Sequence, residues 1–406
     1  MRDITDGFLP APLPGTAAAF VRLAGVGLWR ARMAQLTERV RTGQRSGRAL
    51  AQRHAMELAL DRQAAGAAPT SLAERLIAGM AQEAVATAAR LSPNGRARLR
   101  TRLAEALAGA ATVAPLLHLV RPAARHRARG FAVGHAGLED GAAHDLLIAR
   151  DGTEAEIACD TISAEAGRDV HRGAWTDLMD MVDSDLQTWL AAHPGRYLLK
   201  MTLPQGLRAD RAGLAQLHQR IRAMLAGQRR ADHDEAAVLR LDPLLLAGAQ
   251  MADRVSADRR LVGSLRQEFG AEANLAVTTS GDGVFVLAAR AVRADEVAVA
   301  IRKRLAVIAP LRLSGTRPGI LSMFVEDTDR TEWRALRERL ELEGETRQFL
   351  AHPSSRGVVA VTCTSRLELF GAPAPDAAPE GEMRFRNPAH PGAKAPALAP
   401  AVLSSV

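Results

Sequence analysis

The dipeptide Asp151-Gly152 lies between two extended apolar runs, and it is the feature that most restricts how this chain can fold. A two-residue β-hairpin turn of this kind needs positive φ angles, which aspartate and glycine tolerate better than most residues. The sequence therefore predicts a hairpin with strands over residues 143–148 and 153–162. This hairpin is the strongest short-range structural signal in the chain.

The residues around the hairpin alternate between helical and extended patterns. A helix is predicted over 114–129 and a short strand over 131–135, both before the hairpin. After it come a helix over 170–192, a strand over 196–203 and a helix over 208–226. A hairpin followed by a helical crossover to another strand predicts a mixed sheet covered by helices. The predicted fold class is thus α/β (α+β), with a sheet that mixes parallel and antiparallel strands.

A chain of 406 residues is about two to three times as long as a typical domain, so more than one core is expected. Residues 1–110 predict a helical N-terminal region, because apolar positions keep helical spacing and β-branched runs are absent. Residues 111–230 form the predicted central domain, and 231–370 a C-terminal α/β region with a second hairpin. Residues 371–406 are rich in Pro and Ala without periodicity and predict a disordered tail.

The charge is distributed unevenly along the chain. The net charge is +8, but residues 1–130 hold 20 Arg against 8 acids, whereas 137–185 hold 13 acids against 3 Arg. A basic segment can neutralise phosphates and an acidic one can hold a divalent cation, which is compatible with phosphodiester chemistry. Solvated helix faces give similar counts, so both interpretations stay open.

Two observations bear on the compartment. Only Cys159 and Cys363 are present, which argues against a disulfide scaffold and against a cysteine-based zinc site. The first residues lack the basic and apolar pattern of a signal peptide, and no apolar stretch is long enough to span a bilayer. We expect a cytoplasmic protein without a membrane partner. A homo-oligomer is compatible with these features.

Acidic residues gather on the predicted hairpin. The period-2 pleat puts Glu154, Glu156 and Asp160 on one face of strand 153–162, and Asp145 on the partner strand can face the same row. Carboxylates that converge at the end of a sheet are suitable ligands for Mg²⁺. The sequence predicts a candidate catalytic and metal-binding site of Asp145, Glu156 and Asp160.

The order of elements and these residues resemble the restriction-endonuclease-like, or PD-(D/E)xK, nuclease superfamily, particularly its Mrr-like and uncharacterised bacterial branches. The resemblance covers residues 110–226. In that family an Asp ends one strand and an acid-x-Lys triplet lies on the next, so that the acids hold Mg²⁺ and the Lys orients water or the scissile phosphate. Here Asp145 matches the first ligand, in His144-Asp145, and Ile157-Ala158-Cys159-Asp160-Thr161 lies where the triplet is expected.

The sequence departs from this pattern at two positions. In that register Ala158 replaces the second acid, and Asp160 replaces the lysine. An anion in place of a cation repels the reacting phosphate, so the resemblance implies a degenerate site. A rearranged site with Glu156 and Asp160 would need a cation from elsewhere, and Arg150, Arg168 and Arg172 are the nearest in sequence.

Three further residues predict a phosphate-binding site. Arg168, His171 and Arg172 have i, i+3 and i+4 spacing at the predicted start of helix 170–192. They would share one face where the helix dipole favours an anion. The alternative is that these three residues are solvated and offset the acids beside them.

The predicted function is nucleic-acid binding or processing, with DNA as the expected partner, on a nuclease-like core whose catalytic site is degenerate. One alternative is an active Mg²⁺-dependent endonuclease with a rearranged carboxylate site, and only that alternative needs a metal cofactor. A second alternative is a protein–protein interaction module in which the arginines reflect codon usage.

Overall fold

The computed structural model of the chain describes residues 13–41, 45–109, 111–243, 273–366 and 382–404. The chain divides into two compact units. Unit 1 consists of Met1–Arg39, Ala51–Ala166 and Ala298–Val406, and unit 2 consists of Val40–Leu50 and Gly167–Val297. The fold class is α/β, as predicted, with two mixed sheets, one in each unit.

The predicted helical character of residues 16–110 is confirmed. The helices of this region are α1 (Thr16–Ala24), α2 (Val26–Val40), α3 (Arg45–Arg53), α4 (Ala55–Ala64), α5 (Leu72–Arg90) and α6 (Pro93–Ala106). Ser71 caps α5 by accepting a hydrogen bond from the Glu74 N–H at 3.2 Å, and Ser92 caps α6 in the same way from Gly95 at 3.0 Å.

A six-stranded sheet forms the centre of unit 1, in the order β1-β2-β3-β9-β10-β11. Strand β3 is parallel to β9, and β9 to β10, while the outer strands pair antiparallel. The strands are β1 (Ala132–Gly134), β2 (Leu146–Arg150), β3 (Thr153–Ser163), β9 (Gly319–Glu326), β10 (Val358–Ser365) and β11 (Met383–Arg386). Both β9 and β10 are buried along their whole length, as expected for central strands.

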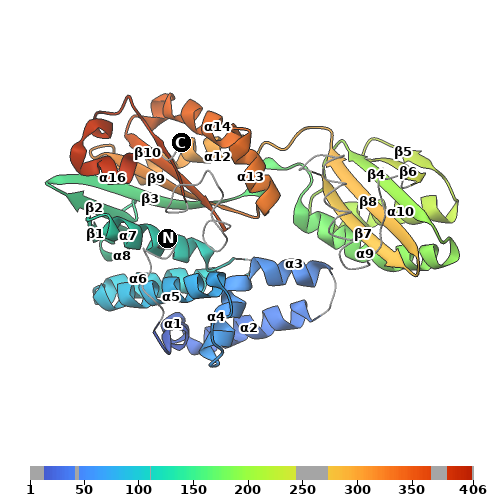
Figure 1. Cartoon of the computed structure of the whole chain (residues 1–406), viewed down its shortest axis with the longest axis horizontal. Helices are drawn as coiled ribbons and strands as arrows, with labels where there is room; N and C mark the ends of the chain where they lie inside the picture. Colours follow the sequence, from blue (N-terminus) through green and yellow to red (C-terminus); the bar gives the residue numbers. More distant parts are fainter. Residues whose placement is uncertain (1–12, 42–44, 110, 244–272, 367–381, 405–406) are drawn as a thin grey trace, which may run out of the picture. The chain divides into compact units, whose positions relative to one another are not determined.

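Helices cover both faces of this sheet (Figure 1). Helix α7 (Ala114–Ala128) packs on β3 and β9 from one side, and the other side carries α12 (Val297–Arg312), α13 (Arg330–Glu338) and α14 (Glu341–Leu350). Helices α1 and α4 pack on α5, which contacts α7, so these N-terminal helices belong to the same unit as the sheet, whereas α3 begins in unit 2. The short elements of unit 1 are α8 (Ala136–Glu139), η2 (Ala164–Gly167), η3 (Pro353–Ser355), η4 (Pro391–Lys394), η5 (Pro396–Leu398) and α16 (Ala399–Val402).

Unit 2 contains a five-stranded sheet in the order β5-β6-β4-β8-β7. Its apolar core lies between this sheet and two helices, and it includes Trp175, Leu178 and Val182, whose i, i+3 and i+7 spacing puts them on one helix face. The strands are β4 (Arg196–Leu203), β5 (Ala231–His233), β6 (Val238–Pro243), β7 (Asn274–Ser280) and β8 (Gly283–Ala291), and the helices are α9 (Arg172–Ala192) and α10 (Arg211–Ala226).

The predicted pairing between the first hairpin and strand 196–203 is wrong. That strand is β4, which pairs in unit 2 with β6 and β8, whereas the parallel partner of β3 is β9. The crossover between the parallel strands β3 and β9 therefore contains helix α12, whereas the helix over 170–192 was expected to provide it. Unit 2 interrupts unit 1 between β3 and α12, and local patterns do not reveal which distant strand closes a sheet. The predicted boundary at residue 230 falls inside unit 2 for the same reason.

The prediction of a disordered tail from residue 371 is wrong for residues 382–404. In this segment β11 joins the six-stranded sheet through β10, and Met383 and Phe385 are buried. Its single strand is only four residues long and is followed by prolines. It therefore has too few residues for the alternation of apolar and polar positions that predicts a strand. Residues 371–381 lie outside the described residues.

In the described parts of the chain, no helix combines the length and the apolar character needed to cross a membrane.

Candidate functional site

The predicted hairpin is present and brings Asp145 next to the centre of β3. Leu146 pairs with Ile157, and the Asp145 N–H donates to the Ile157 carbonyl at 2.9 Å, so Asp145 lies opposite Ala158. The turn residue Asp151 has φ 47° and Gly152 has φ 74°, as the turn type requires. The hairpin thus places the first predicted acid beside the position where the second acid was expected.

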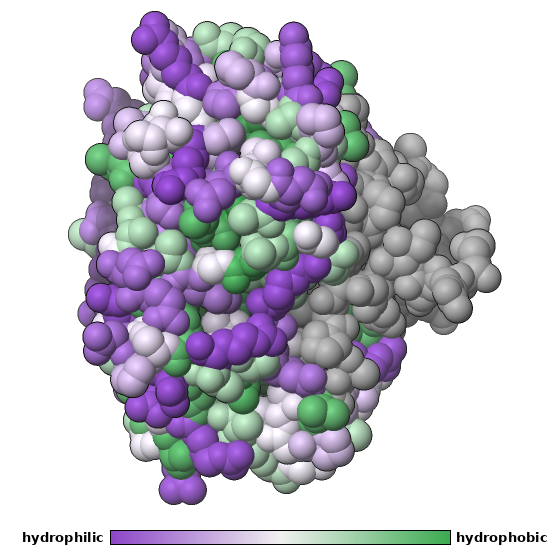
Figure 2. Space-filling model, turned by 90° about the vertical axis from the view of Figure 1, so that its left-hand side faces the viewer, coloured by the Kyte–Doolittle hydropathy of each residue, from purple (hydrophilic) through white to green (hydrophobic). Residues whose placement is uncertain are grey.

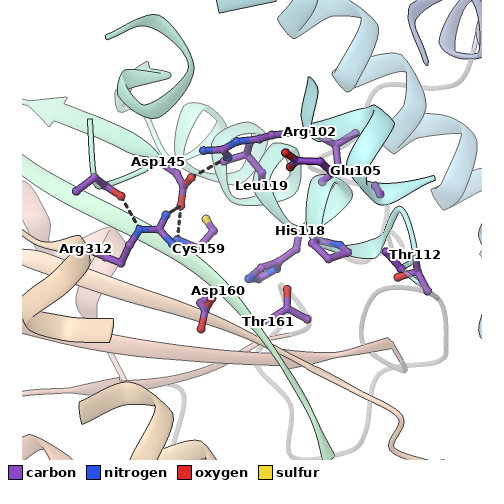
Figure 3. A pocket seen from close by; sticks show the side chains of 15 residues that line it. Arg102, Glu105, Thr112, His118, Leu119, Asp145, Cys159, Asp160, Thr161 and Arg312 are labelled. Atoms are coloured by element: carbon purple, nitrogen blue, oxygen red, sulfur yellow. Dashed lines mark hydrogen bonds and ion pairs between the residues drawn. The ribbon is translucent and has the colours of Figure 1, made fainter. Parts of the chain in front are cut away.

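The Asp145 carboxylate is buried and bound by positively charged groups. Its Oδ1 accepts from Arg102 Nη1 at 3.0 Å, and its Oδ2 accepts from Arg312 Nη2 at 2.7 Å and from the Cys159 N–H at 2.8 Å. Only 2% of Asp145 is exposed, whereas the two guanidinium side chains are partly exposed. One arginine from α6 and one from α12 therefore bind the Asp145 carboxylate (Figure 3).

Glu156 is fully buried and bound by different groups. Its oxygens accept from the Ser314 N–H at 2.8 Å and from the Ser314 hydroxyl at 2.6 Å. Arg317 lies 3.6 Å and His144 3.9 Å from the same carboxylate. These bonds satisfy a charge that would otherwise be costly to bury.

Asp160 forms a two-point ion pair with α12. Arg304 Nε donates to Asp160 Oδ2 at 2.5 Å, and Arg304 Nη2 donates to Oδ1 at 2.9 Å. The Asp160 carboxylate raises the pKa of Arg304 through this hydrogen bond, so the arginine stays charged. The planar guanidinium suits a carboxylate in this two-point geometry.

The acidic residues of β3 share one face, as the predicted pleat requires. The three predicted metal ligands, however, do not form a common metal site. Glu154, Glu156 and Asp160 all pair with α12 or with the loop after it, which fits a common face. Within the described residues, no group of three His, Cys, Asp or Glu side chains could hold a metal ion. Because each carboxylate already has a guanidinium or hydroxyl donor, this donor set does not fit Mg²⁺ as it stands.

The cations at these carboxylates come from parts of the chain that are distant in sequence. Arg102, Arg304, Arg312 and Arg317 provide them, in place of the sequence neighbours of the hairpin. Of those neighbours, Arg150 pairs with the adjacent Asp151, and Arg168 and Arg172 belong to unit 2. No local signal in the sequence connects Arg102, Arg304 or Arg312 with the hairpin.

The predicted phosphate site of Arg168, His171 and Arg172 does not have the expected geometry. Helix α9 begins at Arg172 with His171 as its N-cap, so Arg168 precedes the helix and is not on its face. Arg168 is 3% exposed and lies 4.0 Å from Asp295, and His171 is hydrogen-bonded to Arg208. The i, i+3, i+4 relation assumed a helix that starts several residues earlier than α9 does.

A pocket of about 560 Å³ opens beside Asp145 in unit 1. Its walls come from α6, from the start of α7, from β3 and from the end of α12 (Figure 3). The lining residues are Arg102, Glu105, Ala106, Ala111, Thr112, Pro115, Leu116, His118, Leu119, Ala143, Asp145, Cys159, Asp160, Thr161 and Arg312. Two of the three predicted metal ligands, Asp145 and Asp160, thus line one pocket, whereas Glu156 is not among its lining residues.

Burial shifts the pKa of two further groups of the pocket, His118 and Cys159. It lowers the pKa of His118 to about 4, and it raises the pKa of the Cys159 thiol well above its usual range, with the Asp145 charge adding to that rise. At neutral pH, His118 is therefore neutral and Cys159 is a thiol. A neutral thiol is a poor nucleophile.

Comparison of the chain with protein families, with curated proteins and with solved structures found no significant match.

Proposed function

We propose that this protein binds nucleic acid, with DNA as the expected partner, through a nuclease-like core that does not cleave it. The proposed contact is the pocket beside Asp145, where Arg102 and Arg312 lie. The degenerate positions Ala158 and Asp160 remain the reason to expect binding without catalysis. Cytoplasmic location and homo-oligomerisation remain predictions from the sequence.

The order of elements in unit 1 supports this proposal. Helix α7, strands β1, β2 and β3, helix α12 and strand β9 follow one another as helix, three strands, helix and strand. This is the order on which the resemblance to the restriction-endonuclease-like superfamily rests, with α12 and β9 in place of the elements first expected. Asp145, which the resemblance matches to the first acid of that family, directly precedes β2.

The observation that carries the proposal is the convergence of two guanidinium groups on one carboxylate at the pocket. Guanidinium groups bind carboxylates and phosphates with the same two-point geometry. Arg102 and Arg312 are 39% and 28% exposed, so their remaining N–H groups are accessible to a ligand. A phosphate can therefore replace or join Asp145 between them. With guanidinium groups where metal ligands would be needed, binding is favoured over hydrolysis.

The active Mg²⁺-dependent endonuclease remains the second candidate. It would use Asp145, Glu156 and Asp160, and it would require Arg304 and Arg312 to move away from two of these carboxylates. That rearrangement separates at least two ion pairs, one of them at a buried carboxylate.

The protein–protein interaction module gains little support from the visible surface of unit 1. In Figure 2, hydrophilic side chains are dispersed over the described residues of the face shown, and the hydrophobic areas between them are small. Protein interaction sites are often larger contiguous apolar patches.

Two measurements test the proposal together. The first is cleavage of plasmid and linear DNA in Mg²⁺ or Mn²⁺, with Asp145→Ala as the control, and we expect no cleavage by either protein. Cleavage that Asp145→Ala abolishes would establish the active nuclease instead. The second is DNA binding at low salt, and its absence would overturn both nucleic-acid candidates.

A further inference from the structure

The pocket beside Asp145 has a volume within the range of sites for small organic ligands, which is about 300–1,000 Å³. One end holds the guanidinium groups of Arg102 and Arg312. The rest extends along α6 and the first turns of α7, away from that charged end (Figure 3). The pocket thus has more room than a phosphate group requires.

The walls between the two helices are apolar. Ala106 on α6 and Leu116 and Leu119 on α7 are all lining residues, and each is at least nine-tenths buried. Flat, weakly hydrated groups gain the most from such walls, because they lose apolar contact with water when they enter. A bare phosphate or a sugar phosphate would leave these walls without contacts.

Three polar groups of the pocket can accept hydrogen bonds, namely Glu105, His118 and Asp160. The Glu105 carboxylate has no hydrogen-bond or ion-pair partner among the residues that the structure describes, and it lines the pocket. His118 Nε2 lies 3.0 Å from the Ser322 carbonyl, which can only accept, so Nε2 carries the proton and Nδ1 is an acceptor. Asp160 adds carboxylate oxygens that Arg304 does not saturate.

We infer that this pocket takes one unpaired nucleotide, with its phosphate at Arg102 and Arg312 and an amino-bearing base between the apolar walls. The inference rests on the proposed nucleic-acid function and specifies what its central pocket recognises. The shared chemistry is a base attached to a phosphate, which a free nucleotide and an exposed nucleotide of a strand both provide.

The acceptors predict a preference among bases. Cytosine, adenine and guanine carry an exocyclic amino group that can donate to Glu105 or Asp160, as a carboxylate does when it accepts from cytosine N4. Thymine carries the O4 carbonyl where cytosine carries this amino group, so it would place acceptor against acceptor at that position. We therefore expect cytosine to be favoured over thymine, two bases of similar size.

Titration calorimetry with defined probes tests the inference on the full chain. The probes are dCMP, dTMP, deoxyribose 5-phosphate, and single-stranded dC and dT oligonucleotides. We expect dCMP to bind roughly tenfold more tightly than dTMP, which corresponds to one well-made base contact, and deoxyribose 5-phosphate to bind more weakly than either. The oligonucleotides should follow the same order if a strand provides the nucleotide.

Two variants separate the pocket from nonspecific charge. Glu105→Gln changes an exposed position on α6 and should remove most of the preference for dCMP, whereas Glu338→Gln, on the exposed face of α13, should leave it unchanged. Ala106→Met narrows the pocket and should weaken the binding of both mononucleotides, with thermal unfolding as the check that the variant is folded.

The outcomes distinguish this inference from the proposed function. Strand binding at low salt without mononucleotide binding, or with equal binding of dCMP and dTMP, overturns the pocket inference and leaves the proposed function standing. Mononucleotide binding with the expected preference but without strand binding supports the pocket and overturns DNA as partner. Binding of none of the probes overturns both.

Discussion

At the residue scale, arginine determines what this site can do. The carboxylates that were predicted on β3 and on the strand before it are present on the hairpin, but each is hydrogen-bonded within the chain by an arginine, by a serine or by both. Asp145 is the position where this has the clearest consequence, because it binds two guanidinium groups that are otherwise suited to an incoming phosphate.

Replacing Asp145 by Asn should raise the affinity for DNA at low salt. The variant removes the anion that competes with phosphate for Arg102 and Arg312, so we expect an increase of several-fold. It should also cost about 1–3 kcal/mol of stability, because the amide is a weaker partner for the two arginines. Fluorescence anisotropy with labelled DNA measures the first effect, and denaturant unfolding measures the second.

Asp140→Asn is the matched control, because it removes the same charge from an exposed position nearby in sequence. An equal gain of affinity in both variants would attribute the effect to net charge alone and would contradict the role of Asp145.

A second buried carboxylate makes unit 1 sensitive to acid. Glu382, just before β11, pairs with Arg125 and with Arg129 at 3.0 Å, and these arginines overcome the effect of burial and lower its pKa to about 2. The depressed pKa stabilises the fold fully above the ordinary carboxyl pKa, and this contribution is lost as the pH falls from about 4.5 towards 2.

Glu382→Gln should therefore destabilise unit 1 by about 3–5 kcal/mol at pH 7 and flatten its loss of stability below pH 4.5. Unfolding in urea as a function of pH measures both effects. Glu338→Gln, at an exposed ion pair, should change the free energy of unfolding by less than about 1 kcal/mol. A pH profile unchanged by Glu382→Gln would contradict the assignment.

At the scale of elements, the sequence predicted the secondary structure well and the strand pairing poorly. The bounds of β4 match the prediction, and both hairpins were predicted from short-range patterns. The pairing of β3 with β9 joins segments more than 150 residues apart, and no local period contains that information. The carboxylates were predicted because they belong to a local strand pattern. Their arginine partners were missed because they come from segments distant in sequence.

The parallel pairing of β9 depends on a glycine at its first position. A Cβ atom on Gly319 would lie 2.4 Å from Leu313 Cδ1 and 3.0 Å from the Gly357 carbonyl oxygen. We expect Gly319→Ala to destabilise the protein by about 1–3 kcal/mol through overpacking, as measured by denaturant unfolding. Gly344→Ala in α14 meets open space and should instead stabilise by up to about 1 kcal/mol. Similar effects of the two changes would refute this packing.

At the scale of the whole molecule, unit 2 is an insertion in the chain of unit 1. It has its own sheet and an apolar core of its own, and its main segment runs from Gly167 to Val297. The Glu296 N–H donates to the Gly167 carbonyl at 2.7 Å, so the ends of the insertion are adjacent. The sheet of unit 1 can close without the inserted strands.

Replacing residues 168–296 by a short Gly/Ser linker should consequently leave a chain that folds, because adjacent ends need little loop-closure entropy. Circular dichroism and a single cooperative unfolding transition are the expected results. A linker variant without cooperative unfolding would show that unit 1 depends on the insertion for its fold.

The central claim is that Arg102 and Arg312 contact phosphates of a nucleic acid, and the salt dependence of DNA binding tests it most directly. We expect Arg312→Gln to weaken binding at low salt and to reduce the slope of log affinity against log salt by about 0.9 for each lost contact to a duplex phosphate. Arg347→Gln, an exposed arginine of α14, should leave the slope unchanged. Equal slopes for the wild-type protein and the folded Arg312→Gln variant, or no DNA binding at low salt, would contradict the claim.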